Sequence, residues 1–112
     1  MDIRLKTLNK RLLDRDCELC CNMNVLADVQ EAYGGKLMDA LGSPATLKVT
    51  LVFLAAMFND CADTNGWPER VTPQELGRKM PPNELFALTE EIPALITSAV
   101  QAITTEKEDS KN

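Results

Sequence analysis

The stretch that decides the fold is residues 44–62, PATLKVTLVFLAAMFNDCA. Its leucines and phenylalanines recur at helical spacing, and most of the positions between them are apolar as well. A helix that is apolar nearly all round is typical of the buried centre of a small fold. Because Ser43 followed by Pro44 is the favoured order of a cap and a first helical residue, we expect this central helix to begin at Pro44.

Two shorter helices are predicted before the central one. Asn22 or Asn24 can cap the first, and Gly34-Gly35 supplies its left-handed stop. The second runs from Lys36 to Leu41 and ends at Gly42.

Two helices are also predicted after the loop at residues 63–66. Thr72-Pro73-Gln74-Glu75 is a capping box that begins a short helix, and Pro81-Pro82 stops it. Asn83 is then expected to cap a final helix from Glu84 to about Thr105, in which Pro93 produces a kink or a break.

Apolar and polar side chains alternate over residues 3–8 and again over residues 17–21. This period of two predicts a β-hairpin, with Asn9-Lys10 as its turn. The leucines of the first segment also fit helical spacing, so a helix is the alternative there. The whole pattern predicts a mostly α (α+β) fold, a short N-terminal β-hairpin followed by a compact bundle of about four to five helices. We expect one domain over residues 1–105 and a disordered C-terminal tail over residues 106–112.

The composition disfavours several classes of function. The 112 residues include 12 Lys and Arg, 17 Asp and Glu and no His, which gives a net charge of −5. Without His the commonest general base is missing, so we expect no enzyme and no catalytic residue. The negative charge disfavours nucleic acid as a partner. The longest apolar run, residues 51–58, is well short of the roughly 20 residues that cross a bilayer. We therefore expect a cytoplasmic protein with no membrane partner.

The cysteines raise the question of a metal site. Cys17, Cys20 and Cys21 lie close together, and Cys61 is the fourth cysteine. A structural zinc site needs about four ligands, and one distant cysteine without any His does not complete the set. Reduced, buried thiols are the preferred interpretation, with no metal and no cofactor. A zinc- or thiol-dependent module is an alternative.

The final helix carries more apolar surface than one core needs. On a wheel of about 100° per residue its apolar side chains fill an arc of roughly 180°, whereas packing against one core takes about 100°. The residues left over are Phe86, Ile96 and Val100. Either the N-terminal hairpin covers them, or they bind a partner helix or a second copy of the chain.

The middle of the chain resembles the small phage tail assembly chaperones encoded just before the tape-measure gene in long-tailed phages and prophages. The resemblance rests on residues 23–35, MNVLADVQEAYGG, on residues 51–59, LVFLAAMFN, and on residues 71–78, VTPQELGR. It also rests on the order of elements: a β segment, a short helix ending in Gly, a long apolar helix, a T-x-x-E-L-G helix and a terminal amphipathic helix. It covers roughly residues 16–104.

The resemblance implies a non-enzymatic protein that binds the long, helical tape-measure protein in the bacterial host cytoplasm. Such a protein keeps its partner soluble while tail-tube subunits assemble, and it is absent from the mature virion. A rival from another class is a small helix-turn-helix transcriptional regulator of a prophage, because T-x-x-E-L-G commonly opens that motif. Its second helix should be basic, whereas this one carries Glu84, Glu90 and Glu91.

Overall fold

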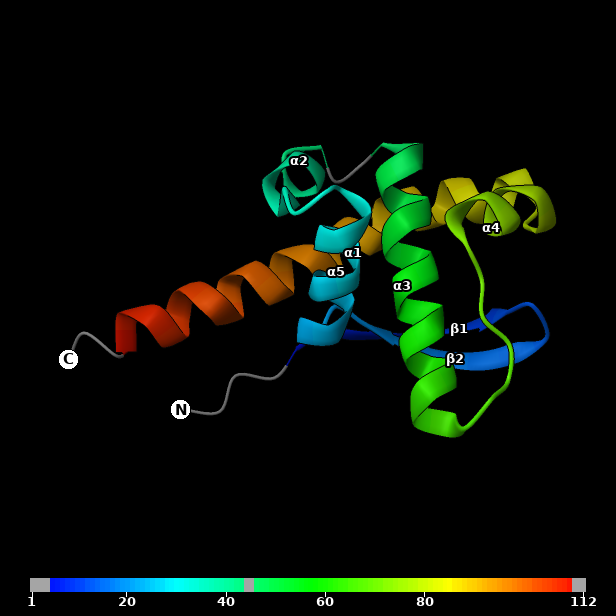
Figure 1. Ribbon diagram of the computed structural model, residues 1–112, viewed down its shortest axis with the longest axis horizontal. Coiled ribbons are helices and arrows are strands. Elements are labelled where there is room, and N and C mark those ends of the chain that lie inside the picture. The colour runs from blue at the N-terminus through cyan, green and yellow to red at the C-terminus, as the bar shows by residue number, and fades with distance from the viewer. Residues whose placement is uncertain (1–4, 44–45, 110–112) are drawn as a thin grey trace.

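A computed structural model describes residues 5–43 and 46–109 of the chain, with side chains as far as Ile103. In these ranges a two-stranded antiparallel hairpin precedes five helices (Figure 1). This confirms the predicted mostly α (α+β) fold with its N-terminal hairpin. The elements are β1 (Thr7–Leu12), β2 (Arg15–Cys20), α1 (Met23–Ala32), α2 (Leu37–Leu41), α3 (Leu47–Asn65), α4 (Pro73–Lys79) and α5 (Pro82–Asp109).

The central helix is α3, most of which is buried among α1, α4, α5 and β2. It begins at Leu47, three residues later than predicted, because Thr46 caps it: the Val49 N–H donates to Thr46 Oγ1 at 3.3 Å. Pro44 itself lies outside the described residues. The helix also extends through residues 63–65, which were predicted to be a loop, and ends at Gly66 with a φ of 73°.

The hairpin turns at Leu13 and Asp14, so the predicted turn at Asn9-Lys10 is wrong. Leu13 and Asp14 have φ values of 48° and 65°. Two positive φ values in a two-residue loop suit a turn whose twist matches that of the strands on either side. Asn9 and Lys10 instead lie within β1 and pair with β2.

Several predicted helix ends are confirmed. Of the two candidate caps for α1, Asn22 is the one used, since its Oδ1 accepts from the Val25 N–H at 3.0 Å. Gly34 follows α1 with a φ of 64°. The Thr72 cap of the predicted capping box is also present: Thr72 Oγ1 accepts from the Glu75 N–H at 3.1 Å and donates to Glu75 Oε1 at 3.2 Å.

The final helix differs from its prediction at both ends. It begins at Pro82, so Asn83 lies inside it and is not its cap. It runs through Pro93 without a break and reaches Asp109, and therefore includes residues 106–109 of the predicted tail. Residues 110–112 lie outside the described part.

The C-terminal end of α5 projects beyond the rest of the molecule (Figure 1). Its 28 residues make a rod of about 42 Å, close to the longest dimension of the protein, 47 Å. Among the helices of the described residues, none has the length and the apolar character needed to span a membrane.

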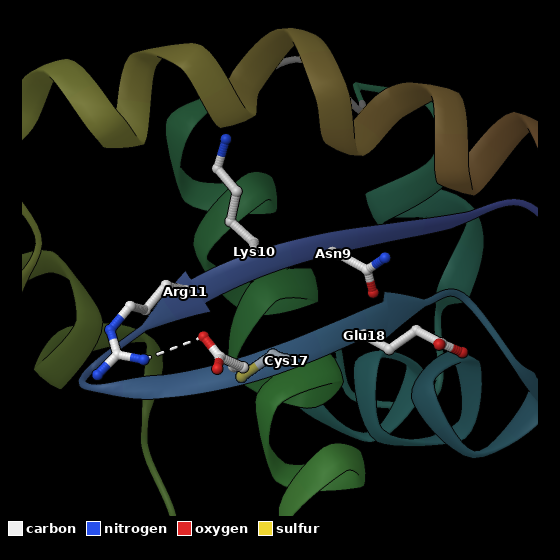
Figure 2. Close-up of a pocket in the computed structure, with 6 residues that line it drawn as sticks. Asn9, Lys10, Arg11, Cys17 and Glu18 are labelled. Atoms are coloured by element: carbon white, nitrogen blue, oxygen red, sulfur yellow. Dashed lines mark hydrogen bonds and ion pairs between the residues drawn. The ribbon is translucent and has the colours of Figure 1, made fainter.

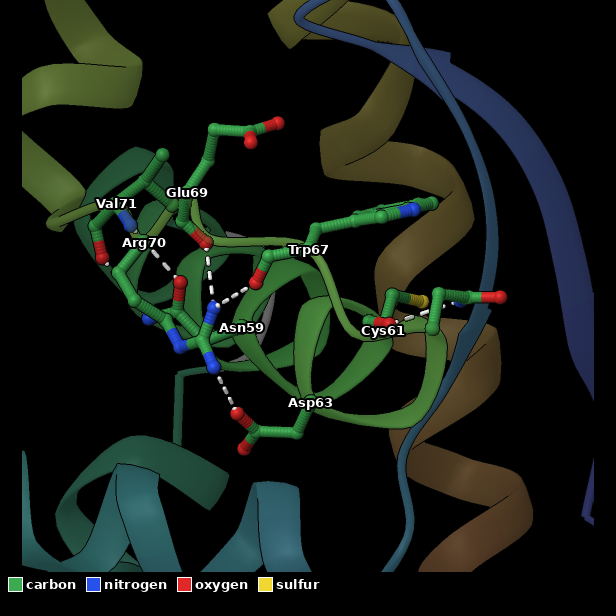
Figure 3. A network of polar contacts seen from close by, with 8 residues as sticks. Asn59, Cys61, Asp63, Trp67, Glu69, Arg70 and Val71 are labelled. Carbon is green, nitrogen blue, oxygen red and sulfur yellow. Dashed lines mark hydrogen bonds and ion pairs between the residues drawn. The ribbon is translucent and has the colours of Figure 1, made fainter.

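The segment between α3 and α4 is fastened to α3 by polar contacts (Figure 3). The Asn59 amide donates to Val71 O and accepts from the Val71 N–H, both at 2.9 Å. Arg70 forms an ion pair with Asp63 and donates to Trp67 O at 2.7 Å. These contacts hold the start of α4 against the middle of α3.

Candidate functional site

One apolar stripe of α5 faces the core along the middle of the helix. The stripe continues toward the C-terminus beyond the end of the core. Ile103 continues this stripe, because it lies four residues after Ala99 and seven after Ile96. Its side chain is nevertheless 46% exposed. The apolar stripe therefore extends past the part of the protein that covers it. The buried members of the stripe are Leu88, Ile92, Leu95, Ile96 and Ala99.

An apolar groove of about 210 Å³ lies beside this uncovered end. Its walls come from three places: Leu5, two residues before β1; the start of α1 together with Cys21, two residues before it; and the C-terminal half of α5. Met23, on the α1 side, is 67% exposed. We call this site the α5 groove. Its lining residues, all apolar, are Leu5, Cys21, Met23, Leu26, Ala99, Ala102 and Ile103.

Hydrogen bonds at both sides position the α5 groove. The Lys6 N–H donates to Ser98 Oγ at 2.8 Å, which fixes the neighbouring Leu5 against α5. On the other side Asn22, the cap of α1, also donates from Nδ2 to Asp60 Oδ2 at 2.7 Å. The side chains that line the groove between these two contacts are apolar.

The three predicted surface residues do not lie together. Ile96 is 3% exposed and belongs to the core, so the prediction that it is left over is wrong. Phe86 and Val100 are 60% and 40% exposed. They are 14 residues apart, about 21 Å along the helix, and do not form one compact surface. Val100 lies one helical turn before Ile103, beside the α5 groove.

Met23 and Ile103 are the functional candidates that the sequence reasoning missed. Ile103 falls within the arc that a helical wheel assigns to the core, and the wheel carries no information on where the body of the protein ends. Met23 is the first residue of α1, and nothing in its local pattern distinguishes it from an ordinary helix start.

A second hollow, of about 320 Å³, lies on the hairpin (Figure 2). Its charged side chains are already paired: Arg11 Nη1 lies 3.0 Å from Asp16 Oδ1, and Lys10 Nζ lies 3.0 Å from Glu91 Oε1 on α5. With its cations neutralised inside the chain, this hollow offers little to an anionic ligand.

The four cysteines are free thiols. Burial raises the pKa of Cys17 to about 11 and that of Cys21 to about 12, and it also raises the pKa of Cys20 and Cys61. Such thiols stay protonated near neutral pH and are poor nucleophiles. Among the side chains that the structure describes, in residues 5–43 and 46–103, no three of His, Cys, Asp or Glu are grouped so that they could hold a metal ion. The zinc- or thiol-dependent alternative gains no support from this geometry.

No protein-family model, no curated protein and no solved structure matches this chain.

Proposed function

We propose that this chain is a non-enzymatic tail assembly chaperone of a phage or prophage, which binds the tape-measure protein in the host cytoplasm during tail morphogenesis. The observation that carries the proposal is the α5 groove, with Val100 and Ile103 exposed beside it. The order of elements supports it too, since the hairpin, the Gly-terminated helix, the buried α3, the T-x-x-E-L-G helix and α5 follow the order of that family.

The size of the α5 groove favours a protein partner over a small molecule. Ligand pockets usually measure about 300–1,000 Å³, whereas this groove measures about 210 Å³. A partner helix that lies in a groove inserts one or two side chains at a time, at positions i, i+3, i+4 and i+7. The exposed Met23, Val100 and Ile103 extend the apolar contact beyond the groove itself.

The chemistry of the groove also favours binding without catalysis. Its lining includes no charged and no hydroxyl side chain, and its one thiol, Cys21, has a pKa raised by burial to about 12. A holdase needs this combination of a local apolar surface and an overall charge that opposes aggregation, here −5.

Co-expression with the tape-measure protein encoded downstream tests the proposal. In the double variant Val100→Ser/Ile103→Ser we expect co-purification to be lost, because two exposed apolar side chains at the groove become polar. The matched control is Phe86→Ser, which makes the same kind of change about 21 Å away on the same helix and should leave co-purification intact. Far-UV circular dichroism checks that both variants keep their helices. If the double variant still co-purifies at the wild-type level, the α5 groove is not the binding site.

The same variants distinguish a second copy of the chain as the occupant. Analytical ultracentrifugation of wild-type protein without any partner should give a monomer that the double variant does not change. A wild-type dimer that the double variant dissociates would assign the groove to self-association instead.

A further inference from the structure

A furrow between α1 and α3 lies apart from the α5 groove and plays no part in the proposed function. It consists of two hollows, of about 440 and 430 Å³, which Asp28 lines in common. The first hollow is also lined by Val71, Thr72 and Pro73, where the chain enters α4. The two helices run antiparallel along it: Asn22, at the start of α1, bonds Asp60 near the end of α3, whereas Ala32, at the end of α1, shares a hollow with Val52. We call this feature the α1/α3 furrow.

Each helix lines the furrow with one continuous stripe. The lining residues recur at positions i, i+3, i+4 and i+7, so those of each helix fall on one broad face. From Val52 to Thr64 the furrow follows α3 for about 18 Å, roughly three helical turns. That length suits a helix lying in the furrow. The α1 stripe is Asn24, Ala27, Asp28, Glu31 and Ala32, and the α3 stripe is Val52, Ala55, Ala56, Asn59, Asp60, Asp63 and Thr64.

The two ends of the furrow differ in chemistry. One end has a floor of small apolar side chains, Val52, Ala55 and Ala56, over which another backbone can come close. Toward the other end the walls are acidic, with Asp60 and Asp63 on α3 facing Asp28 on α1. The furrow therefore has an apolar floor at one end, with Asp28 and Glu31 on its α1 wall, and acidic walls on both helices toward the other end.

The acidic side chains along the furrow are largely unneutralised. Arg70 pairs with Asp63, but no ion pair among the described side chains reaches Asp28, Glu31 or Asp60. The pKa of the Asp28 carboxyl is raised, first by burial and then by the charges of Glu31, Asp60 and Asp63. A cation bound here would relieve this repulsion.

We propose that the α1/α3 furrow binds a cationic amphipathic helix of another protein. Apolar side chains of that helix pack on Ala55 and Ala56, and its Lys or Arg side chains lie against Asp28 and Glu31. Charge complementarity of this kind selects partners and speeds association. The α5 groove has no charged lining and takes an uncharged apolar face, so the two sites bind different surfaces and either proposal can fail without the other.

A labelled synthetic peptide of about four helical turns, with leucine and alanine on one face and lysines toward one end, tests the furrow. Its binding is followed by fluorescence anisotropy in about 0.1 M salt, where charges further apart than about 10 Å are largely screened. Wild-type protein should bind it saturably and should bind the same peptide with glutamates in place of the lysines at least tenfold more weakly. The double variant Asp28→Asn/Glu31→Gln should weaken binding of the lysine peptide about fivefold.

The matched control is Asp39→Asn/Glu90→Gln, which removes one Asp and one Glu at exposed positions outside the furrow. It changes the net charge equally and should alter the Kd less than twofold. Equal weakening by both double variants would mean that the peptide responds only to net charge, and it would overturn the proposal. So would the absence of saturable binding to wild-type protein. Ala32→Trp, which fills the apolar end from an exposed position, should also weaken binding, and an unchanged Kd there would exclude that end of the furrow.

Discussion

Ile96 and Ile103 lie seven residues apart on the same stripe of α5, yet Ile96 is 3% exposed and Ile103 is 46% exposed. The two side chains are chemically identical and sit on one helix, and the difference is whether the rest of the protein reaches them. Ile96 packs in the core with α3, whereas Ile103 lies at the rim of the α5 groove. One apolar stripe therefore serves the fold over most of its length and is left as free surface at its end.

This difference in burial predicts that the same Ile→Ala substitution lowers the free energy of unfolding by different amounts at the two positions. Ile96→Ala removes fully buried methyl groups and should lower the free energy of unfolding by about 3 kcal/mol. Ile103→Ala removes half-exposed ones and should lower it by less than about 1 kcal/mol. Urea unfolding followed by circular dichroism measures both values. Equal losses in the two variants would mean that Ile103 is covered in the folded monomer.

The Asn59 side chain predicts a second large stability effect. Its amide satisfies both backbone polar groups of Val71, each at 2.9 Å (Figure 3). Asn59→Ala leaves that N–H and that carbonyl without their partner and should cost about 3 kcal/mol. Asn59→Asp keeps the acceptor for the Val71 N–H and loses the donor, so its melting temperature should fall between those of the wild type and Asn59→Ala. A melting temperature of Asn59→Ala close to that of the wild type would contradict the role assigned to this amide.

Local signals were enough to predict most of the helices. Gly34, the capping box at Thr72 and the apolar character of α3 each act within a few residues, so the sequence exposes them directly. The hairpin turn was missed because neither Leu13 nor Asp14 is a glycine, although both have positive φ. Asn9-Lys10 looks more like a turn, but pairing with β2 places both residues inside a strand.

The candidate site was only partly predictable, since exposure depends on the whole fold. A helical wheel gives the direction of a side chain and not its position along the axis relative to the core. It therefore counted Ile96 among the residues left over from the core and Ile103 among those that face it, whereas Ile96 is buried and Ile103 is exposed. For Phe86 and Val100 the sequence left open whether the hairpin covers them, and in the structure both are exposed.

The raised pKa of Asp28 predicts a stability change that depends on pH. Because the pKa in the folded state lies above the unfolded value of about 3.9, folded protein binds more protons than unfolded protein between the two pKa values. Stability is therefore lost as the pH rises through the folded pKa. Asp28→Asn should raise the melting temperature at neutral pH, and the gain should vanish below about pH 3.9.

A control at another aspartate separates this effect from a general loss of negative charge. Asp39 lies in the first turn of α2, where the helix dipole favours an acidic side chain. Asp39→Asn should therefore give no gain in melting temperature at any pH. Equal stabilisation by the two variants would attribute the effect to net charge and not to the neighbours of Asp28.

Burial predicts an order of reaction among the thiols. Near pH 8 an alkylating reagent attacks the thiolate, and Cys17 and Cys21 are both buried and have pKa values of about 11 and 12. Cys20 is partly exposed and should be modified first, whereas Cys17 and Cys21 should react only after unfolding. Mass spectrometry of peptides after timed labelling gives the order. Cys20→Ser should remove the fast phase, and fast labelling of Cys21 in native protein would show that the α5 groove opens further than this structure indicates.

The hairpin turn predicts a gain in stability from one substitution. Asp14 has a φ of 65° and is exposed, in a left-handed conformation that glycine adopts without steric cost. Asp14→Gly should raise the free energy of unfolding by about 0.5 kcal/mol, because it relieves the backbone strain of a positive φ. The gain is small because glycine also has more conformational freedom in the unfolded chain. Asp14→Val, whose branched side chain tolerates positive φ poorly, should lower it by about 1 kcal/mol. Chemical denaturation of the wild type and the two variants measures these changes. If Asp14→Gly and Asp14→Val shift the free energy of unfolding in the same direction, the backbone at residue 14 is not left-handed and the pairing register of β1 with β2 must differ.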